Sequence, residues 1–271
     1  MIQWLNDPGN WTATGGVFDQ LAAHLQYALI ALVISAVLAL PAGLLIGHTG
    51  RGRWLITVAN AMRALPVVGL LILLYVMLAP HIHGRGDTVY LLPTEIVLVL
   101  LAIPPILSNT FAGVENVDPA VRDAAAGMGM RGGQVVRKVE LPNALPLIFS
   151  GLRSAALQVI ATATVAAYLG LGGLGRFVYD GQASQNFAER NAGALLVALL
   201  AVAVDLVLAV AQRYTVSRGV SGRLPKGAGP GRADAPGAQD SAEPTAAPPP
   251  APHTAGPRVA RPPRTAGGSM E

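Results

Sequence analysis

Two short patterns in the chain could bind a cofactor, and the residues around them argue against both. Residues 170–175, Gly-Leu-Gly-Gly-Leu-Gly, fit the glycine pattern of dinucleotide-binding loops, but that loop must follow a β-strand. An uncharged apolar stretch of helical length precedes these glycines, so we expect a flexible bend without nucleotide. His81 and His83 could ligate a metal, but zinc usually takes three or four protein ligands, so we expect a solvated loop.

Charged residues within apolar stretches are the other candidates for chemistry. Asp205 is the only carboxylate that we expect deep within such a stretch, where an ionisable group is a functional candidate because exposed charge is costly in lipid. It could line a pathway, pair with a polar group at a helix interface, or lie near the cytoplasmic end. Arg63 lies at the start of another apolar stretch, and from there its long side chain can extend to the membrane–water interface.

The composition excludes several classes of function. The chain has no cysteine, which removes disulfide and thiol–metal chemistry. It contains no Gly-Xaa4-Gly-Lys-Ser/Thr pattern, so ATP hydrolysis would belong to another polypeptide. The pI near 9.8 could suggest nucleic acid, but the basic residues flank apolar segments, where membrane topology and anionic lipid headgroups explain them. We therefore expect contact with membrane lipid and no nucleic-acid partner.

The apolar stretches have the length of membrane spans. Of 271 residues, 52% are hydrophobic and 13% charged, and the mean hydropathy is +0.48. Soluble domains carry about 25% charged residues. The uncharged stretches can cross roughly 30 Å of hydrocarbon as helices. We expect an all-α polytopic integral membrane protein of the cell membrane, with five transmembrane helices at residues 25–47, 55–80, 96–114, 154–175 and 191–212.

Two alternatives to this membrane topology fit poorly. The helices of a soluble bundle would show a regular polar face, which residues 28–46 and 64–80 lack. The first apolar stretch is far longer than the core of a signal peptide, and no basic residue precedes it.

Basic residues predict the orientation. Cytoplasmic loops are enriched in Lys and Arg, and five spans with the N-terminus outside and the C-terminus in the cytoplasm place the three basic clusters inside. These clusters follow the first, third and fifth spans and contain Arg51 and Arg53; Arg122, Arg131, Arg137 and Lys138; and Arg213, Arg218, Arg223 and Lys226.

The loop after the third span has a distinct local pattern. Asp118 and Pro119 are typical of a helix N-cap and first helical position. A run of alanines follows and leaves a smooth surface that a partner can approach closely. Gly129 and then Gly132 and Gly133 are expected to break or turn the chain.

The same loop carries a motif. It contains Asp-Ala-Ala at 123–125, then three residues, Gly129, nine residues, Val139, one residue, and Leu-Pro at 141–142. This spacing resembles the EAA loop of ABC importer permeases of the binding-protein-dependent class, with Asp123 in place of the commoner Glu. The resemblance implies a short cytoplasmic helix that docks into a groove of the ATPase subunit. The matched positions are Asp123, Ala124, Ala125, Gly129, Val139, Leu141 and Pro142. Leu141 and Pro142 are expected to begin the return into the membrane.

Other segments resemble one branch of that class, the glycine betaine, carnitine and choline osmoprotectant permeases. They are Ala-Met-Arg-Ala-Leu-Pro at 61–66, Pro-Pro-Ile-Leu-Ser-Asn-Thr-Phe-Ala-Gly at 104–113 and the glycine-rich segment at 170–175. Ser108 replaces a basic residue of the branch and Phe111 replaces a tyrosine. Pro66 and Asn109, within these segments, join Asp205 as candidates for the pathway or a helix interface.

The resemblance implies the following function and partners. The chain would be a pore-forming subunit without catalytic residues, cofactor or metal of its own. It would import quaternary-amine osmoprotectants such as glycine betaine, choline and carnitine, with proline as a further candidate. Its partners would be a cytoplasmic ATPase dimer that binds ATP and magnesium, a second permease subunit, identical or homologous, and an external solute-binding protein.

An importer for an amino acid or phosphonate is the alternative within the class. A secondary transporter would need repeats and midplane charges that are not evident, and a scaffold would have no reason to carry the motif.

The chain divides into three parts. Residues 1–20 would form an external N-terminal segment, 21–218 the permease domain, and 219–271 a Pro-, Ala- and Gly-rich tail that has too few apolar residues to fold.

Tyr75, Tyr90 and Tyr168 are spread over three expected helices and form no evident aromatic cage. High-affinity recognition of a quaternary ammonium is therefore expected in a separate binding protein.

Overall fold

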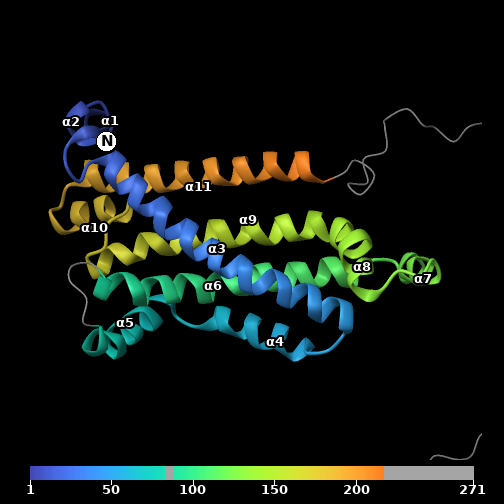
Figure 1. The fold of residues 1–271 in the computed structure, drawn as a ribbon. Coiled ribbons are helices and arrows are strands. Elements are labelled where there is room, and N and C mark those ends of the chain that lie inside the picture. The colour runs from blue at the N-terminus through green and yellow to red at the C-terminus, as the bar shows by residue number, and fades with distance from the viewer. Residues whose placement is uncertain (83–87, 217–271) are drawn as a thin grey trace, which may run out of the picture. The chain divides into compact units, whose positions relative to one another are not determined.

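The structure, a computed structural model, describes residues 1–82 and 88–216 and consists there of helices joined by turns (Figure 1). Its long helices are α3 (Val17–Thr49), α6 (Thr88–Glu115), α9 (Leu141–Ala166) and α11 (Phe187–Thr215). Each of the four lies in a helical stretch long and apolar enough to cross a membrane. The all-α membrane fold is confirmed. The predicted tail at 219–271 and His83 lie outside the described residues.

The second expected span is broken, so the prediction of one uninterrupted helix over residues 55–80 is wrong. Helix α4 (Arg53–Ala61) and a short 3-10 turn are bent by 94° from α5 (Val67–Leu78). Pro66 causes the break, because a proline disfavours helical geometry in the preceding residue and supplies no N–H. Leu65 accordingly has extended backbone angles, φ −69° and ψ 132°, and Pro66 becomes the N-cap of α5.

The directions of the helices show that the bent pair makes a full crossing. Close contacts join Gly43 to Thr110 and Gly47 to Val114, so α3 and α6 run in the same direction. The chain must therefore return between them, through α4 and α5. Helix α9 runs opposite to α6, since Gly151 lies against Pro105 and Gly113 against Ala144. Helix α11 reverses direction again after the short α10 (Gly175–Ala183), and the chain makes five crossings.

Small residues let the three central helices approach closely. Gly43 and Gly47 lie four residues apart on α3, and a Cβ atom at either would be 2.7 or 2.6 Å from the Cβ of Thr110 or Val114. A Cβ at Gly151 of α9 would be 2.8 Å from the Cβ of Asn109 on α6. In lipid, close backbone packing of this kind replaces the hydrophobic effect as a source of helix association. These glycines therefore fix the spacing of α3, α6 and α9.

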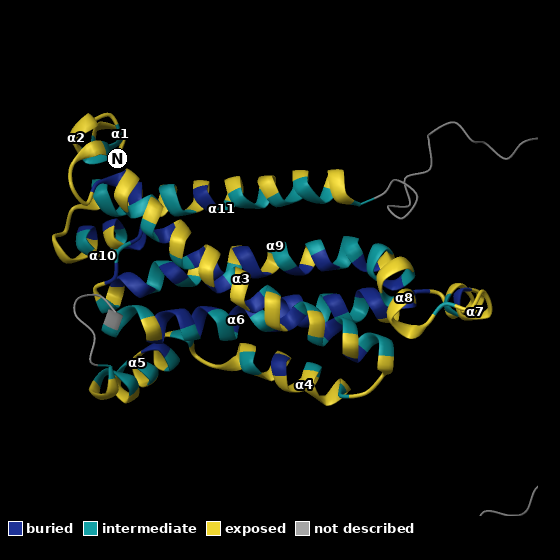
Figure 2. Cartoon of the chain, in the orientation of Figure 1, coloured by how far each residue is buried: buried dark blue, intermediate teal, exposed yellow. Residues whose placement is uncertain are grey.

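The outer helices leave apolar side chains uncovered. Only Ala192, Gly193 and Leu200 of α11 are buried, and its exposed residues include Leu199, Val202, Leu206 and Val207 (Figure 2). A soluble protein would bury such a stripe, so this surface fits lipid or another membrane subunit.

The termini of the long helices differ from the expected span limits. Helix α6 begins at Thr88, before the expected residue 96, and therefore contains the buried Glu95. Asp205 is thus not the only carboxylate within a span. Helix α3 begins at Val17, so the expected boundary between residues 20 and 21 falls inside a helix. Before it, α1 (Ile2–Leu5) and α2 (Pro8–Thr12) form a small cap, in which Trp4 packs edge-on against Phe177 at 5.3 Å.

Candidate functional site

The predicted loop helix is present as α7 (Pro119–Gly127). The Asp118 carboxylate accepts a 2.8 Å hydrogen bond from the backbone N–H of Ala120, and Pro119 occupies the first turn. This N-cap satisfies a backbone donor that would otherwise lack a partner at the start of the helix. The expected helix start at Asp118 and Pro119 is confirmed.

Helix α7 presents most of its surface to the outside. It lies beyond the ends of α6 and α9 in Figure 1, and Ala125 is its one buried residue. Asp123 and Ala124 are exposed, as are the larger apolar side chains of Val121 and Met128, at 46% and 72%. A surface of small residues bordered by two exposed apolar side chains can seat closely in a groove of another protein.

Gly129 turns the chain at the end of α7. Its φ of +80° lies in the left-handed region that side chains other than glycine rarely adopt. The Gly129 N–H donates to the carbonyl of Ala126, and the Met130 N–H to that of Ala125. A Cβ at Gly129 would meet nothing within 4 Å, so backbone conformation, and not crowding, requires glycine here.

The expected turn at Gly132 and Gly133 is wrong, because these residues begin α8 (Gly132–Val135). Helix α8 continues through a π-helical turn (Val136–Glu140) into α9, so the return helix starts well before Leu141. Pro142 has no N–H and would clash with the carbonyl four residues earlier in a regular helix. The π turn relieves this clash, and the Leu141 N–H accordingly donates to the more distant carbonyl of Val136.

The motif therefore divides into two structural parts. Asp123, Ala124 and Gly129 lie on the exposed helix and its turn, together with the buried Ala125. Val139, Leu141 and Pro142 are partly buried in the return helix, where Leu141 packs against the core of Val114, Ala144 and Ile148. The first part forms a surface and the second part seats the loop on the helix bundle.

Glu140, between the two apolar residues of the motif, is the polar centre that the sequence reading missed. It is fully buried, and its Oε1 lies 3.0 Å from Nε of Arg122 on α7. The Nδ1 of His48, at the end of α3, lies 3.0 Å from Oε2. The Arg122 guanidinium also donates to the carbonyl of Val114 in α6. A carboxylate flanked by Val139 and Leu141 was the available signal, but nothing in the sequence indicated its partners.

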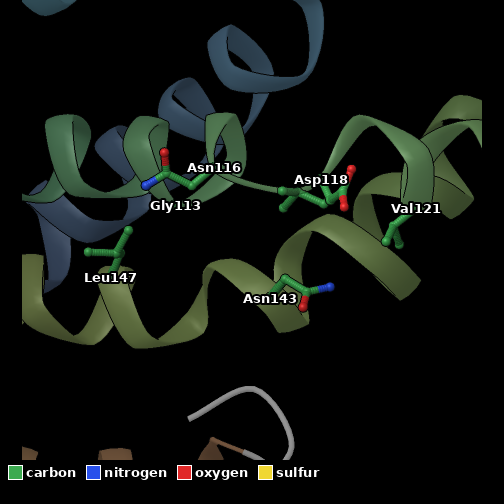
Figure 3. A pocket seen from close by; sticks show the side chains of 7 residues that line it. Gly113, Asn116, Asp118, Val121, Asn143 and Leu147 are labelled. Atoms are coloured by element: carbon green, nitrogen blue, oxygen red, sulfur yellow. The ribbon is translucent and has the colours of Figure 1, made fainter. Parts of the chain in front are cut away.

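A hollow of about 250 Å³ lies on another side of α7 (Figure 3). It is bounded by the end of α6, the start of α7 and the first turns of α9, and Figure 3 shows Asn116, Val121 and Asn143 around it. The side chains of α7 consequently do not fill the space against α9 on this side.

Asp205 forms an interhelical ion pair. Its two carboxylate oxygens each lie 2.7 Å from a nitrogen of Arg153, which places α11 beside α9 through a bidentate contact. Arg153 lies inside α9, one residue before the expected start of that span. Of the other two candidates, Asn109 lies at the α6–α9 contact and Pro66 at the break between α4 and α5.

The tyrosines are grouped more closely than the sequence indicated. Tyr75 of α5 stacks on Tyr90 of α6 with 5.3 Å between ring centroids. Tyr168 meets Tyr179 of α10 edge to face at 5.6 Å, and both are exposed. Beside this pair, Gly170 and Gly173 have positive φ angles and form the expected glycine bend.

Comparison with known proteins decides the family. Residues 35–219 match the model of the binding-protein-dependent transport system inner membrane component. The chain belongs to this family. It is a permease subunit of an ABC transporter, located in the cell membrane as a multi-pass protein, and such subunits are not themselves catalytic.

Relatives and a solved structure agree with this assignment. The permease is 31% identical over 212 residues to the glycine betaine/carnitine/choline transport system permease protein OpuCB of Bacillus subtilis, covering 78% of this chain and 94% of that one. It is 34% identical over 186 residues to the carnitine transport permease protein OpuCB of Listeria monocytogenes, covering 68% and 81%. An inward-facing structure of the MetNI methionine ABC transporter shares the fold, with a TM-score of 0.63, 23% identity, and coverage of 78% and 100%.

Proposed function

We propose that this permease imports quaternary-amine osmoprotectants, driven by an ATPase dimer that docks on α7. The exposed helix α7 carries the proposal, because it bears the first half of the motif at the end of the helix bundle. ATP and magnesium would be bound by the ATPase, and closure of its two subunits would move α7 and switch the pore between its outward and inward states.

A second permease subunit and an external solute-binding protein complete the proposed transporter. The exposed apolar residues of α5 and α11 offer surfaces for lipid and for a second copy or close relative of this chain. The tyrosine pairs do not enclose a quaternary ammonium, which is best held by several aromatic faces. Selectivity would therefore follow the binding protein, and the pore would be permissive.

The distribution of charge supports a cytoplasmic position for α7. In Figure 1 the end of α3, the start of α4 and the end of α11 lie at the same end of the bundle as α7, and α10 and the start of α11 lie at the opposite end. Arg51 and Arg53 fall at the α3–α4 connection, Arg131 is the N-cap of α8, and Arg213 is in the last turn of α11. Arg176 is in α10 and Arg190 is in the first turn of α11. The preference for basic residues inside the cell then places α7 and the end of α11 in the cytoplasm and the N-terminus outside.

Thiol labelling tests this orientation, since the chain has no cysteine of its own. We expect Ser184→Cys, in the exposed turn after α10, to react with a membrane-impermeant reagent in intact cells. Met128→Cys, 72% exposed beside α7, should react only after permeabilisation. Labelling of the Met128 variant from outside would reverse the orientation and separate α7 from any cytoplasmic ATPase.

Uptake by cells tests the substrate class. The names of the relatives support glycine betaine, choline and carnitine as substrates. Deletion of the gene should abolish ATP-dependent uptake of at least one of these labelled solutes, most clearly under osmotic stress, and a plasmid copy should restore it. Unchanged uptake of all three, with loss of amino-acid or phosphonate uptake, would favour the alternative importer and reject the substrate assignment.

A further inference from the structure

The buried carboxylate of Glu140 joins four elements beneath the proposed docking helix. Its own residue ends the π turn that leads into α9, Arg122 comes from α7, and His48 comes from the end of α3. Arg122 adds the fourth element by donating to the Val114 carbonyl of α6. A carboxylate that is 0% exposed must be held by opposite charge or hydrogen bonds, because its desolvation is costly.

The groups around Glu140 have positions that favour its contacts with Arg122 and His48. The Arg122 guanidinium lies between a carboxylate and a carbonyl in the last turn of α6, where the helix dipole favours a cation. The Nδ1 of His48 lies within hydrogen-bond distance of both carboxylate oxygens, at 3.0 and 3.1 Å, and an ionised carboxylate can only accept in such a contact. Gly132 leaves room for the ring, since a Cβ there would be 3.2 Å from Nε2 of His48.

Helix α7 has little else to hold its position. Ala125 is its one buried residue, and the hollow of Figure 3 separates its other side from α9. Within the part of the chain that the structure describes, Arg122 is the α7 side chain with polar contacts to other helices. Apart from the backbone connections to α6 and α8, the Arg122–Glu140 contact is therefore the polar link through which movement of α7 can reach α3, α6 and α9.

We propose that Glu140 is a positioning residue for coupling: it fixes α7 to the ends of α3, α6 and α9, so that motion of a docked ATPase moves the helices together. The inference rests on the proposed docking function of α7. It assigns the coupling role to a buried residue that does not touch the ATPase, in addition to the exposed part of the motif.

A distance measurement tests the positioning directly and needs no partner. Spin labels are attached at Met128→Cys beside α7 and Leu45→Cys on α3, which are 72% and 64% exposed. The distance distribution should be narrow with Glu140 present and clearly broader after Glu140→Gln, which keeps the shape but loses the charge. Arg122→Met breaks the contact from the α7 side and should broaden it similarly. An unchanged distribution in a folded variant of either kind would overturn the proposal.

Transport measurements on the complex with its ATPase test the coupling. Glu140→Gln should retain ATPase association but raise the ATP hydrolysed per solute imported by about tenfold, within the usual range of coupling between sites. Arg122→Met should act similarly, and the double variant should be no worse than either single one. Arg137→Gln, which removes an exposed cation one turn away, is the control and should leave the ratio unchanged.

The outcomes separate the two levels of inference. A normal ratio in Glu140→Gln would overturn the positioning role while leaving docking on α7 intact. Equal loss of ATPase association in Glu140→Gln and Arg137→Gln would also overturn it, because the loss would then not depend on the buried Arg122–Glu140 contact. Failure of the unaltered chain to associate with any ATPase would instead reject the proposed function, and the positioning role with it.

Discussion

Gly129→Ala is expected to weaken ATPase association and uncouple transport, while the chain still inserts into the membrane. Alanine has space at this position, because no atom lies within 4 Å of the Cβ position of Gly129. It lacks the backbone freedom of glycine, however, and Gly129 has a φ of +80°. A side chain in the left-handed region costs roughly 1–2 kcal/mol. That energy corresponds to about a 5- to 30-fold change in an equilibrium constant, which should appear in the affinity of the permease for its ATPase.

Gly127→Ala is the matched control for this experiment. Gly127 is also exposed, also has nothing within 4 Å of its Cβ position, and lies only two residues away, but its φ is helical. Alanine there should preserve α7 or strengthen it by about 1 kcal/mol through helix propensity. ATPase binding and solute uptake are measured side by side. Equal losses in both variants would mean that the added methyl group obstructs the docking surface, contrary to the conformational explanation.

Gly47→Ala is expected to destabilise the helix bundle itself. Its new Cβ would lie 2.6 Å from the Cβ of Val114, a distance that α3 and α6 can relieve only by moving apart. Overpacking of this kind costs typically about 1–3 kcal/mol. The thermal unfolding of the purified permease in detergent should therefore occur at a lower temperature, and the amount accumulated in membranes should fall.

Gly69→Ala controls for the loss of a glycine from a membrane helix. Gly69 lies on α5, and the nearest atom to its Cβ position is Pro66 Cγ at 3.5 Å, an ordinary contact. We expect its unfolding temperature to stay near that of the unaltered chain. If Gly47→Ala were equally stable, α3 and α6 would not be packed through Gly43 and Gly47 in the membrane.

The sequence predicted the membrane crossings because span length and charge are local properties. It also predicted α7, since Asp118 and Pro119 supply a recognisable helix start. It placed the turn at Gly129 but added a second turn at Gly132, because a glycine pair has the same local signal whether it ends a helix or starts one. The length and apolarity of residues 55–80 indicate a span, but they do not reveal that Pro66 bends it by 94°.

The contacts between distant residues could not be obtained in this way. His48 and Arg122 reach Glu140 across 92 and 18 positions of the sequence, and Arg153 reaches Asp205 across 52. The sequence around each of these residues does not indicate its partner, and only the packing of the helices brings the charges together. The buried part of the motif therefore gained a structural explanation that its spacing alone could not provide.

Transport by the reconstituted complex tests the central claim most directly. The permease is purified with its ATPase and second permease subunit, placed in liposomes, and supplied with the external binding protein and labelled glycine betaine or choline. Uptake should require magnesium and ATP on the side that bears α7, and binding protein on the other side. Uptake that proceeds at the same rate without ATP or without the ATPase would contradict the assignment of this chain to an ATP-driven importer.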